Sequence, residues 1–253
     1  MSVKNVLIFG QSGTGKSSVV NLMAGEKKAK TSNETKRCTI HWEEHRIDFS
    51  EHTFKVFDTI GIEEPQLGID EYLAVIENSY NLITRLQKQG GGIDLLLFCV
   101  RAGRYTSTIH NNYRLFYECL CEEKVPIVLI ITGLERESNM ESWWTRSKAE
   151  FDKYDVVVND HACITAIHGT DWNQHYEDSR RLVRDLVLKH CYKSGPHELA
   201  DEGWLSRFTI KLKEVFVRVL GSKKKKKIVD VLTNRCGMPR EAALRLATRI
   251  TTT

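Results

Sequence analysis

The residues best suited to chemistry stand together near the start of the chain, in the segment Gly-Gln-Ser-Gly-Thr-Gly-Lys-Ser at residues 10–17. This segment satisfies the pattern G-x-x-x-x-G-K-[ST], in which glycines let backbone N–H groups surround phosphate oxygens at the start of a helix. The lysine of the pattern reaches the β and γ phosphates, and the hydroxyl that follows it binds Mg²⁺. We therefore predict a phosphate site, with Lys16 also contributing to catalysis, made of Ser12, Gly13, Thr14, Gly15, Lys16, Ser17 and Ser18.

A second motif, Asp-Thr-Ile-Gly at 58–61, closes a short apolar run. An aspartate at a strand end is placed to hold Mg²⁺ through water, and a glycine three residues later offers its N–H to a γ phosphate, which makes Gly61 a predicted nucleotide contact. The polar stretch at 31–39 suits a switch loop whose threonine completes the Mg²⁺ site. Thr39 directly precedes a predicted strand, so Thr35 is preferred over it as the catalytic threonine. The expected metal ligands are Ser17, Thr35 and Asp58.

These motifs, with Glu-Thr-Lys-Arg-Cys at 34–38 and Gly-Arg-Tyr-Thr at 103–106, resemble the AIG-type GTPases. This immunity-associated nucleotide-binding (GIMAP-like) family is related to septins and chloroplast import receptors, and the resemblance covers roughly residues 1–190. In that family the arginine of the G-R-[FY]-T segment can act as a finger across a G-domain dimer. The resemblance therefore implies a homodimer through the nucleotide face, with Arg104 as a catalytic residue. The alternative is that Arg104 is a surface arginine that caps a loop.

Base recognition departs from the usual GTPase pattern. A standard GTPase carries [NT]-K-x-D after its fifth strand, and its carboxylate accepts two hydrogens from guanine, whereas this chain has Thr132-Gly133-Leu134-Glu135. Glu135 can substitute for the aspartate, but Gly133 replaces the lysine that covers the base, so affinity or selectivity for guanine is expected to fall. By the same resemblance, Thr165 and Ala166 occupy the loop whose backbone N–H meets the guanine O6. Thr132, Glu135, Thr165 and Ala166 are the predicted base-side contacts.

The residue after Gly61 is Ile62, where Ras-like proteins place a glutamine that orients water. We therefore expect Mg²⁺-dependent GTP hydrolysis at the β–γ phosphoanhydride that is slow in the isolated chain and stimulated by G-domain dimerisation. Two other interpretations stay open at this point. One is a nucleotide-gated scaffold at a membrane surface with little turnover. The other is an ATP-using P-loop protein, such as a phosphotransferase, although the motif at 58–61 argues against a phosphotransferase.

The elements that position these motifs alternate along the chain. Apolar runs predict strands at 3–9, 54–58, 93–100, 126–132 and 162–165, and a hairpin strand at 41–49 that reaches the second of them across Ser50, Glu51 and His52. Helical patterns lie between them, at 16–24, 69–89, 109–122, 142–151 and 176–190. The alternation predicts an α/β fold: a doubly wound, mainly parallel six-stranded sheet of the P-loop NTPase type with a helical C-terminal extension.

Charge divides the chain unevenly. Residues 223–253 hold nine Lys or Arg and two Asp or Glu, a net charge of +7, so residues 1–222 carry −3 of the chain's +4. We expect a G domain at 1–195, an amphipathic helix at 196–222 and a basic helical tail at 223–253. The helix is expected to pack on the domain; the alternatives are contact of the five lysines from Lys223 to Lys227 with an anionic membrane, or a nuclear localisation patch. No specific nucleic-acid partner is expected.

Localisation follows from what the sequence lacks. No apolar run approaches the roughly 20 residues that a membrane-spanning helix needs, and no secretory signal precedes the first predicted strand. The seven cysteines are scattered through apolar segments and are expected to be reduced core thiols. We expect a cytoplasmic protein, with the basic tail as an alternative peripheral membrane contact.

Overall fold

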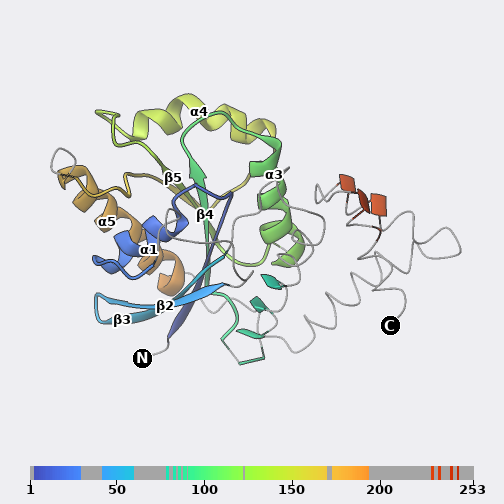
Figure 1. Ribbon diagram of the computed structural model, residues 1–253, viewed down its shortest axis with the longest axis horizontal. Helices are drawn as coiled ribbons and strands as arrows, with labels where there is room; N and C mark the ends of the chain where they lie inside the picture. Colours follow the sequence, from blue (N-terminus) through green and yellow to red (C-terminus); the bar gives the residue numbers. More distant parts are fainter. Residues whose placement is uncertain are drawn as a thin grey trace, which may run out of the picture.

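The computed structural model describes residues 3–29, 42–59, 91–121, 123–169 and 173–193, and isolated positions elsewhere at 78–79, 82–83, 85–86, 88–89, 229–230, 233–234, 240–241 and 244. A six-stranded sheet with the order β2-β3-β1-β4-β5-β6 forms the centre of the molecule (Figure 1). Its strands are β1 (Lys4–Phe9), β2 (Glu43–Phe49), β3 (His52–Asp58), β4 (Leu95–Arg101), β5 (Ile127–Thr132) and β6 (Asp160–Cys163). All neighbours pair in parallel except β2, which runs antiparallel to β3 at one edge.

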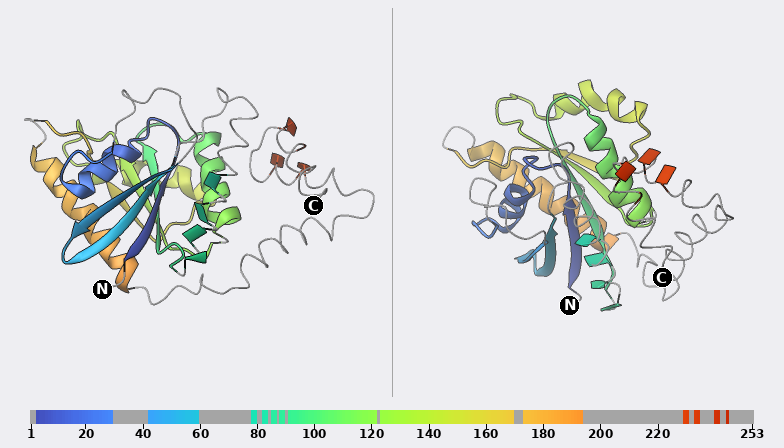
Figure 2. Two further views of the ribbon diagram at one scale, coloured as in Figure 1. Left: turned by 60° about the horizontal axis from the view of Figure 1, so that its bottom comes forward. Right: turned by 45° about the vertical axis from the view of Figure 1, so that its right-hand side comes forward.

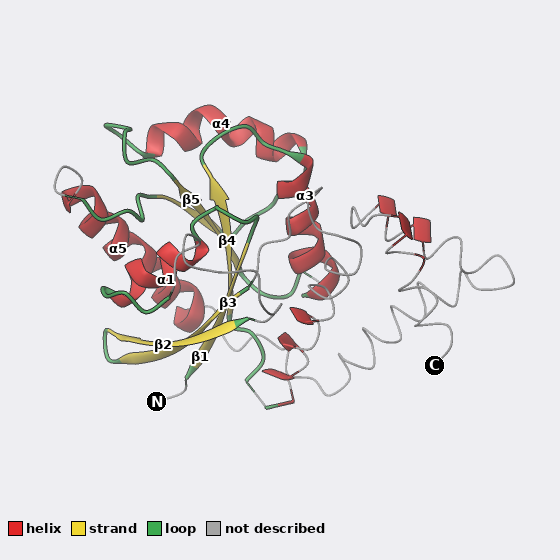
Figure 3. Cartoon of the chain, viewed as in Figure 1, coloured by secondary structure: helices red, strands yellow, loops and turns green. Residues whose placement is uncertain are grey.

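Helices cover both faces of this sheet, which confirms the predicted doubly wound fold (Figures 1 and 2). On one face lie α1 (Lys16–Ala24) and α5 (Asn173–Leu188), which continues into a π-helix, η3 (Lys189–Lys193). On the other face lie α3 (Ser107–Tyr113), the π-helix η1 (Arg114–Leu120) and α4 (Glu141–Lys153), as Figure 3 shows in red. On each face, a cluster of buried apolar side chains packs the helices against the sheet.

Burial explains why the central strands are continuous apolar runs. Every residue of β5 is buried, and β4 is buried except for its last residue, because helices cover both sides of these strands. The edge strand β2 is exposed at most of its positions and buries only Ile47 and Phe49, as expected for a strand that faces solvent. The apolar sequence pattern therefore marks the inner strands more sharply than the outer ones.

The helix that follows the phosphate motif is fixed at both ends. Gly15 precedes its first residue and Gly25 follows its last, both in the left-handed conformation that glycine tolerates. Arg184 of α5 donates from Nε and Nη2 to the carbonyl oxygen of Met23, at 2.8 and 2.6 Å. This contact satisfies a C-terminal carbonyl of α1 and places a positive charge at the negative end of the helix dipole. The helix that follows the phosphate motif is thereby bonded at its C-terminal end to α5.

Several element bounds differ from those predicted. The β2–β3 turn contains only Ser50 and Glu51, both with positive φ, and His52 already pairs with Phe49; a two-residue turn of this kind matches the twist of the two strands. Strand β6 begins two residues earlier than predicted, at Asp160, because it pairs with β5 from Val128 onward. The predicted helix at 109–122 is observed as α3 followed by η1, in which Cys121 N–H donates to Phe116 O.

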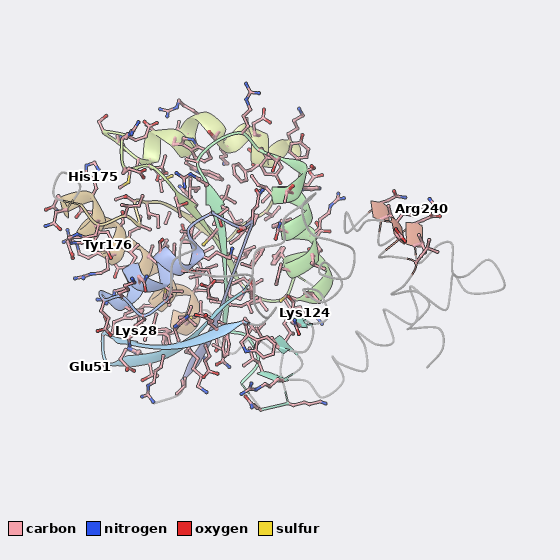
Figure 4. The ribbon with its side chains drawn as sticks, in the orientation of Figure 1. Lys28, Glu51, Lys124, His175, Tyr176 and Arg240 are labelled. Atoms are coloured by element: carbon pink, nitrogen blue, oxygen red, sulfur yellow. The ribbon has the colours of Figure 1, made fainter. Side chains whose placement is uncertain are left out.

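Side-chain contacts support this arrangement away from the strand ends. Lys28, in the loop after α1, donates from Nζ to the carbonyl oxygen of Arg46 on β2 at 2.9 Å, and Figure 4 shows its side chain beside the β2–β3 hairpin. Cys99, Cys121, Cys163 and Cys191 are free and buried, as predicted for core thiols. Among the described residues, no helix is long and apolar enough to cross a membrane.

The division of the chain into a G domain, an amphipathic helix and a basic tail is not settled by the fold. The predicted helix at 196–222 and the run from Lys223 to Lys227 lie outside the described residues. Of the predicted tail, Val229 is buried with the cluster that includes Leu120, and the carbonyl oxygen of Asn234 accepts a bond from Arg114 at 3.5 Å. These domain bounds therefore stay predictions.

Candidate functional site

The loops that carry the predicted motifs meet at one edge of the sheet. Because β1, β3, β4, β5 and β6 are parallel, the loops that follow them all leave from their carboxyl ends. The chain winds from β1 toward β3 on one side and later returns to β4 on the other, so β1 and β4 flank the point where the winding reverses. In open α/β sheets this point is where ligands bind.

The phosphate loop after β1 is held open by its backbone. Gly10 has φ +143°, and a Cβ at this position would lie 2.1 Å from the carbonyl oxygen of Cys99 on the neighbouring strand. Gly13 and Gly15 also have positive φ, of 74° and 87°. Thr14 closes the turn by donating from its N–H and Oγ1 to Gln11 O, at 3.3 and 2.7 Å. The loop therefore has the glycine-dependent curvature that a phosphate cradle needs, and Ser12 and Gly13 are exposed at its tip.

Lys16 is buried in this loop. Its Nζ donates to the carbonyl oxygens of Gly10 and Gln11, each at 3.0 Å. These bonds hold the ammonium group within the curve of the loop, close to where backbone N–H groups converge. The arrangement places a positive charge next to the predicted phosphate positions. An ammonium group there would attract the phosphate oxygens as a point charge.

Two predicted metal ligands touch each other. Ser17, in the first turn of α1, donates from Oγ to Oδ2 of Asp58, the last residue of β3, at 2.6 Å. Burial raises the pKa of Asp58 above its usual value, although the charge of Lys16 and the hydrogen bond from Ser17 oppose that rise. A hard oxygen-seeking cation such as Mg²⁺ fits this pair, because it would take a hydroxyl and a carboxylate oxygen and would favour the ionised carboxylate.

The residue after Asp58 is bonded to β1, the strand that leads into the phosphate loop. Thr59 donates from Oγ1 and N–H to the carbonyl oxygen of Ile8 on β1, at 2.9 and 3.2 Å. Sequence reasoning did not single out this residue, although its place directly after the aspartate was visible. The remaining members of the predicted site in this region, Gly61, Thr35 and its alternative Thr39, lie outside the described residues, as does Ile62.

The predicted base loop after β5 is bonded to the phosphate loop. Thr132 donates from Oγ1 to the carbonyl oxygen of Thr14 at 2.7 Å, and both residues are buried. Three residues later, Oε2 of Glu135 is buried and has no hydrogen-bond partner in the described part of the chain. A buried carboxylate oxygen left without a donor is costly, so this atom fits a ligand with N–H groups such as the guanine edge.

The loop after β6 contributes two predicted residues whose situations differ. Thr165 is fully buried, and its N–H donates to Oγ of Ser179 on α5 at 3.1 Å. Ala166 is partly exposed and contacts the buried cluster beside α1 and α5. Of the two backbone N–H groups, that of Thr165 is therefore already donated within the protein.

Arg104 is exposed, and the two residues that follow it are anchored by contacts with neighbouring elements. Tyr105 stacks on Tyr154 with ring centroids 4.6 Å apart and meets Phe151 edge-on at 5.0 Å. Thr106 accepts a bond from Ile109 N–H at 3.3 Å and so caps the start of α3. The side chain of Arg104 is exposed between β4 and these anchors.

Arg101, which sequence reasoning missed, also lies at this edge. It is the last residue of β4 and pairs with Thr132 in the sheet register. Its side chain lies beside Gly133, whose ideal Cβ would be 3.3 Å from Arg101 Cγ. The available signal was a single arginine at the end of an otherwise apolar strand.

Comparison with known proteins agrees with this geometry. The family model described as "50S ribosome-binding GTPase" matches residues 5–133. No curated protein matches the chain. Among solved structures, one of Era in complex with MgGDPNP and nucleotides of 16S ribosomal RNA has a TM-score of 0.56 and 19% identity over 79% of this chain, which spans only 61% of the Era chain.

Two structures of plant proteins are similar to a comparable degree. Toc33 from Arabidopsis thaliana, in complex with Mg²⁺ and GMPPNP, has a TM-score of 0.52 and 17% identity, over 77% of this chain and 86% of Toc33. A structure of chloroplast translocon components whose dimerisation is described as important for GTPase activity has a TM-score of 0.53 and 16% identity, over 79% and 87% of the two chains. At these identities the likeness concerns the fold.

Proposed function

This chain belongs to the 50S ribosome-binding GTPase family, and from that premise we propose that it binds guanine nucleotide with Mg²⁺ and hydrolyses GTP slowly until two G domains pair. P-loop nucleotide binding and GTP hydrolysis are the activity of the family. The slow rate, the dimer and the kinship with AIG-type GTPases are the finer parts of the proposal. They rest on Ile62, on Arg104 and on the motifs at 34–38 and 103–106.

One observation carries the proposal: two parts of a nucleotide site are attached to each other around the phosphate loop. Ser17 touches Asp58 on one side of the loop, and Thr132 holds Thr14 on the other. Glu135, three residues beyond Thr132, has a buried oxygen that accepts no hydrogen bond from the described residues. In the proposed site, these two bonds join the phosphate loop to the metal ligand Asp58 on one side and to the strand end before the base loop on the other.

Each residue has a defined task in this proposal. Backbone N–H groups of residues 13–18 hold the phosphates, and Lys16 stabilises the charge that develops on the transferred phosphoryl group. Ser17 and Asp58 would hold Mg²⁺, which neutralises charge on the β and γ phosphates when it is bound. Glu135 accepts hydrogen bonds from the guanine edge, and Arg104 acts on the partner's nucleotide across the dimer. Thr35 keeps its predicted role as a ligand of Mg²⁺, and Gly61 keeps its predicted contact with the γ phosphate.

Support for the dimer comes from the exposure of Arg104 beside the nucleotide edge. The solved chloroplast translocon components, for which dimerisation is described as important, share this fold. An arginine supplied in trans accelerates GTP hydrolysis by about 10³ to 10⁵-fold, which would offset the absence of a water-orienting glutamine at Ile62.

The alternatives named from the sequence make different demands. A nucleotide-gated membrane scaffold would bind through Lys223 to Lys227 and would not need turnover, and an ATP-using protein would not need Glu135. Era was solved with ribosomal RNA nucleotides. For this chain, the net charge of −3 on residues 1–222 still favours no specific nucleic-acid partner for the G domain.

Equilibrium binding of fluorescent GTP, GDP and ATP analogues with Mg²⁺ tests the proposal directly. We expect guanine nucleotides to bind more tightly than ATP, and Glu135→Ala to lose that preference while retaining phosphate-dependent binding. Arg181→Ala, on the exposed side of α5, is the matched control and should bind like the wild type. Equal affinity of the wild type for ATP and GTP would contradict the guanine assignment and favour an ATP-using protein.

A further inference from the structure

We propose that Arg101 forms the wall of the guanine site that Gly133 leaves open, so that an arginine from β4 replaces the missing lysine of the base loop. This inference rests on the proposed function, because it assigns a further residue to the same nucleotide site. The guanidinium group of Arg101 would contact the face of the base. It reaches the base from β4, the neighbour of β5, which leads into the base loop.

The sheet places Arg101 beside the base loop. Arg101 pairs with Thr132 in the parallel register of β4 and β5, and the N–H of Ala102 donates to Thr132 O at 2.8 Å. Thr132 is the residue whose hydroxyl holds the phosphate loop. Arg101 is therefore attached through the backbone to the strand end at which the base loop begins.

Gly133 and Arg101 fit each other. Gly133 has φ +82°, and a Cβ built on it would lie 3.3 Å from Cγ, 3.5 Å from Nε and 3.8 Å from Cζ of Arg101. The Arg101 side chain thus lies in contact with the position where a side chain at 133 would begin. A lysine there would have a strained backbone, and the arginine beside it would have to shift slightly. The glycine at position 133 therefore leaves room for the Arg101 side chain beside the base loop.

Charge in this corner favours a ligand with an aromatic face and polar edge. Arg101 is exposed, and no carboxylate of the described residues forms an ion pair with it. Glu135, two residues after Gly133, has a buried Oε2 that finds no hydrogen-bond partner within the ranges the structure describes. A guanidinium plane packs well on an aromatic ring, and a carboxylate accepts hydrogens from the ring edge. Together they suit the face and the edge of a guanine base.

Binding constants for GDP and inosine diphosphate separate these two contacts, because inosine lacks only the 2-amino group. For Arg101→Ala we expect both nucleotides to bind about 3- to 30-fold more weakly, the range of a cation–π contact, with the ratio between them unchanged. Glu135→Ala should bring the ratio close to one. Arg101→Lys should retain part of the affinity, and Arg181→Ala should bind as the wild type does.

A rescue variant tests the exchange of the two residues. Removing the arginine leaves room beside position 133 but not relief from its positive φ, so Arg101→Ala combined with Gly133→Lys should unfold at a lower temperature than Arg101→Ala and, below that temperature, bind GDP more tightly. Thermal unfolding of each variant without nucleotide controls for folding, and Arg101→Lys keeps the experiment decisive if the alanine variant is unstable.

Three outcomes would overturn the assignment. Unchanged GDP affinity in Arg101→Ala would show that the arginine does not contact the base, while leaving the proposed function intact. Weaker binding of GTP with unchanged GDP would place the guanidinium at the γ phosphate instead. A wild-type chain that binds no guanine nucleotide would remove the proposed function and this inference together.

Discussion

At the scale of single residues, hydrogen bonds from side chains join the segments of the candidate site. The hydroxyl of Thr132 donates to the buried carbonyl oxygen of Thr14, and this bond joins the base loop to the phosphate loop. On the other side of the phosphate loop, Ser17 donates to the carboxylate of Asp58, the residue proposed with it to hold Mg²⁺. Because each pair comes from segments far apart in the sequence, each contact depends on correct folding of the sheet between them.

Replacing Thr132 by valine should expose the importance of the first contact. Valine keeps the shape but removes the donor, so the carbonyl of Thr14 is left buried without its partner, at a cost of about 1–3 kcal/mol in the free energy of unfolding. The phosphate loop should also hold GDP less tightly. Denaturant unfolding and GDP titration measure the two effects, and Thr132→Ser, which retains the hydroxyl, should restore both. Equal behaviour of the valine and serine variants would show that the bond is unimportant.

At the scale of elements, the β2–β3 hairpin carries a local conformational cost. Ser50 and Glu51 have φ of 49° and 63°, a region that residues with side chains avoid. Their turn is short because two residues suffice to reverse a twisted pair of strands. Asn-Gly is the sequence that this kind of turn favours, so a substitution in the turn can raise the free energy of unfolding.

Glu51→Gly should therefore raise the free energy of unfolding by about 1 kcal/mol, since glycine adopts positive φ without steric cost. Chemical denaturation of the chain measures the change. Glu44→Gly, an exposed substitution within β2, provides the opposite control and should lower stability by about 0.5–1 kcal/mol. A destabilised Glu51→Gly variant would mean that the turn is held by contacts of the glutamate side chain.

The π-helix η3, which continues α5, is joined to the edge strand β6 by a charge cluster. Asp160 accepts from Lys189 Nζ at 2.7 Å and lies 3.2 Å from His190 Nε2. Burial alone would raise the pKa of Asp160, but the hydrogen bonds from Lys189 and His190 outweigh it and lower that pKa. A carboxylate with a lowered pKa stabilises the folded chain above its unfolded pKa, and this stabilisation is lost as the pH falls through the folded pKa.

Asp160→Asn should accordingly lower the free energy of unfolding by about 0.5–1 kcal/mol at pH 7. The difference from the wild type should shrink as the pH falls below about 4, where the carboxyl of Asp160 becomes protonated in the unfolded state and then in the folded state. Urea unfolding at a series of pH values measures this. Asp185→Asn, at an exposed position of α5, should show no such pH-dependent difference. A difference that stays constant down to pH 2 would exclude the ion pair as its cause.

At the scale of the whole molecule, the nucleotide edge is also the expected contact with a second copy. Arg104 is exposed, and in the proposed function it acts on the nucleotide of the second copy. If pairing supplies the arginine, the rate per chain depends on how many chains are paired. Turnover then becomes a property of the assembly and not of the single domain.

Specific GTPase activity of the wild type should therefore rise with protein concentration and reach a plateau. For Arg104→Ala we expect a rate close to that of the dilute wild type at every concentration, while Arg181→Ala retains the rise. Sedimentation measurements on the same samples relate activity to the fraction of dimer. Activity per chain that is independent of concentration, or full activity of Arg104→Ala, would rule out this role for the arginine.

The sequence by itself determined the fold class and the phosphate loop. A phosphate loop is one contiguous segment whose glycines and lysine act through their own backbone, so residues 10–17 could be read directly, and α1 was predicted at its observed bounds. The buried strands were equally clear because helices cover both of their faces. Strand β6 was placed two residues late, because its first residues, Asp160 and His161, are polar and only half-buried at the sheet edge.

Tertiary structure alone decided which side chains meet. The place of Arg101 against Gly133 depends on register between strands, and the N–H of Thr165 is engaged by a contact with α5. Only the tertiary arrangement shows that Oε2 of Glu135 is buried and, among the described residues, has no hydrogen-bond partner. No local pattern encodes such distances, because the residues concerned lie on separate loops that only the sheet brings together. The sequence could name the candidates for base recognition, but only the sheet could place a cation from β4 beside the glycine of the base loop.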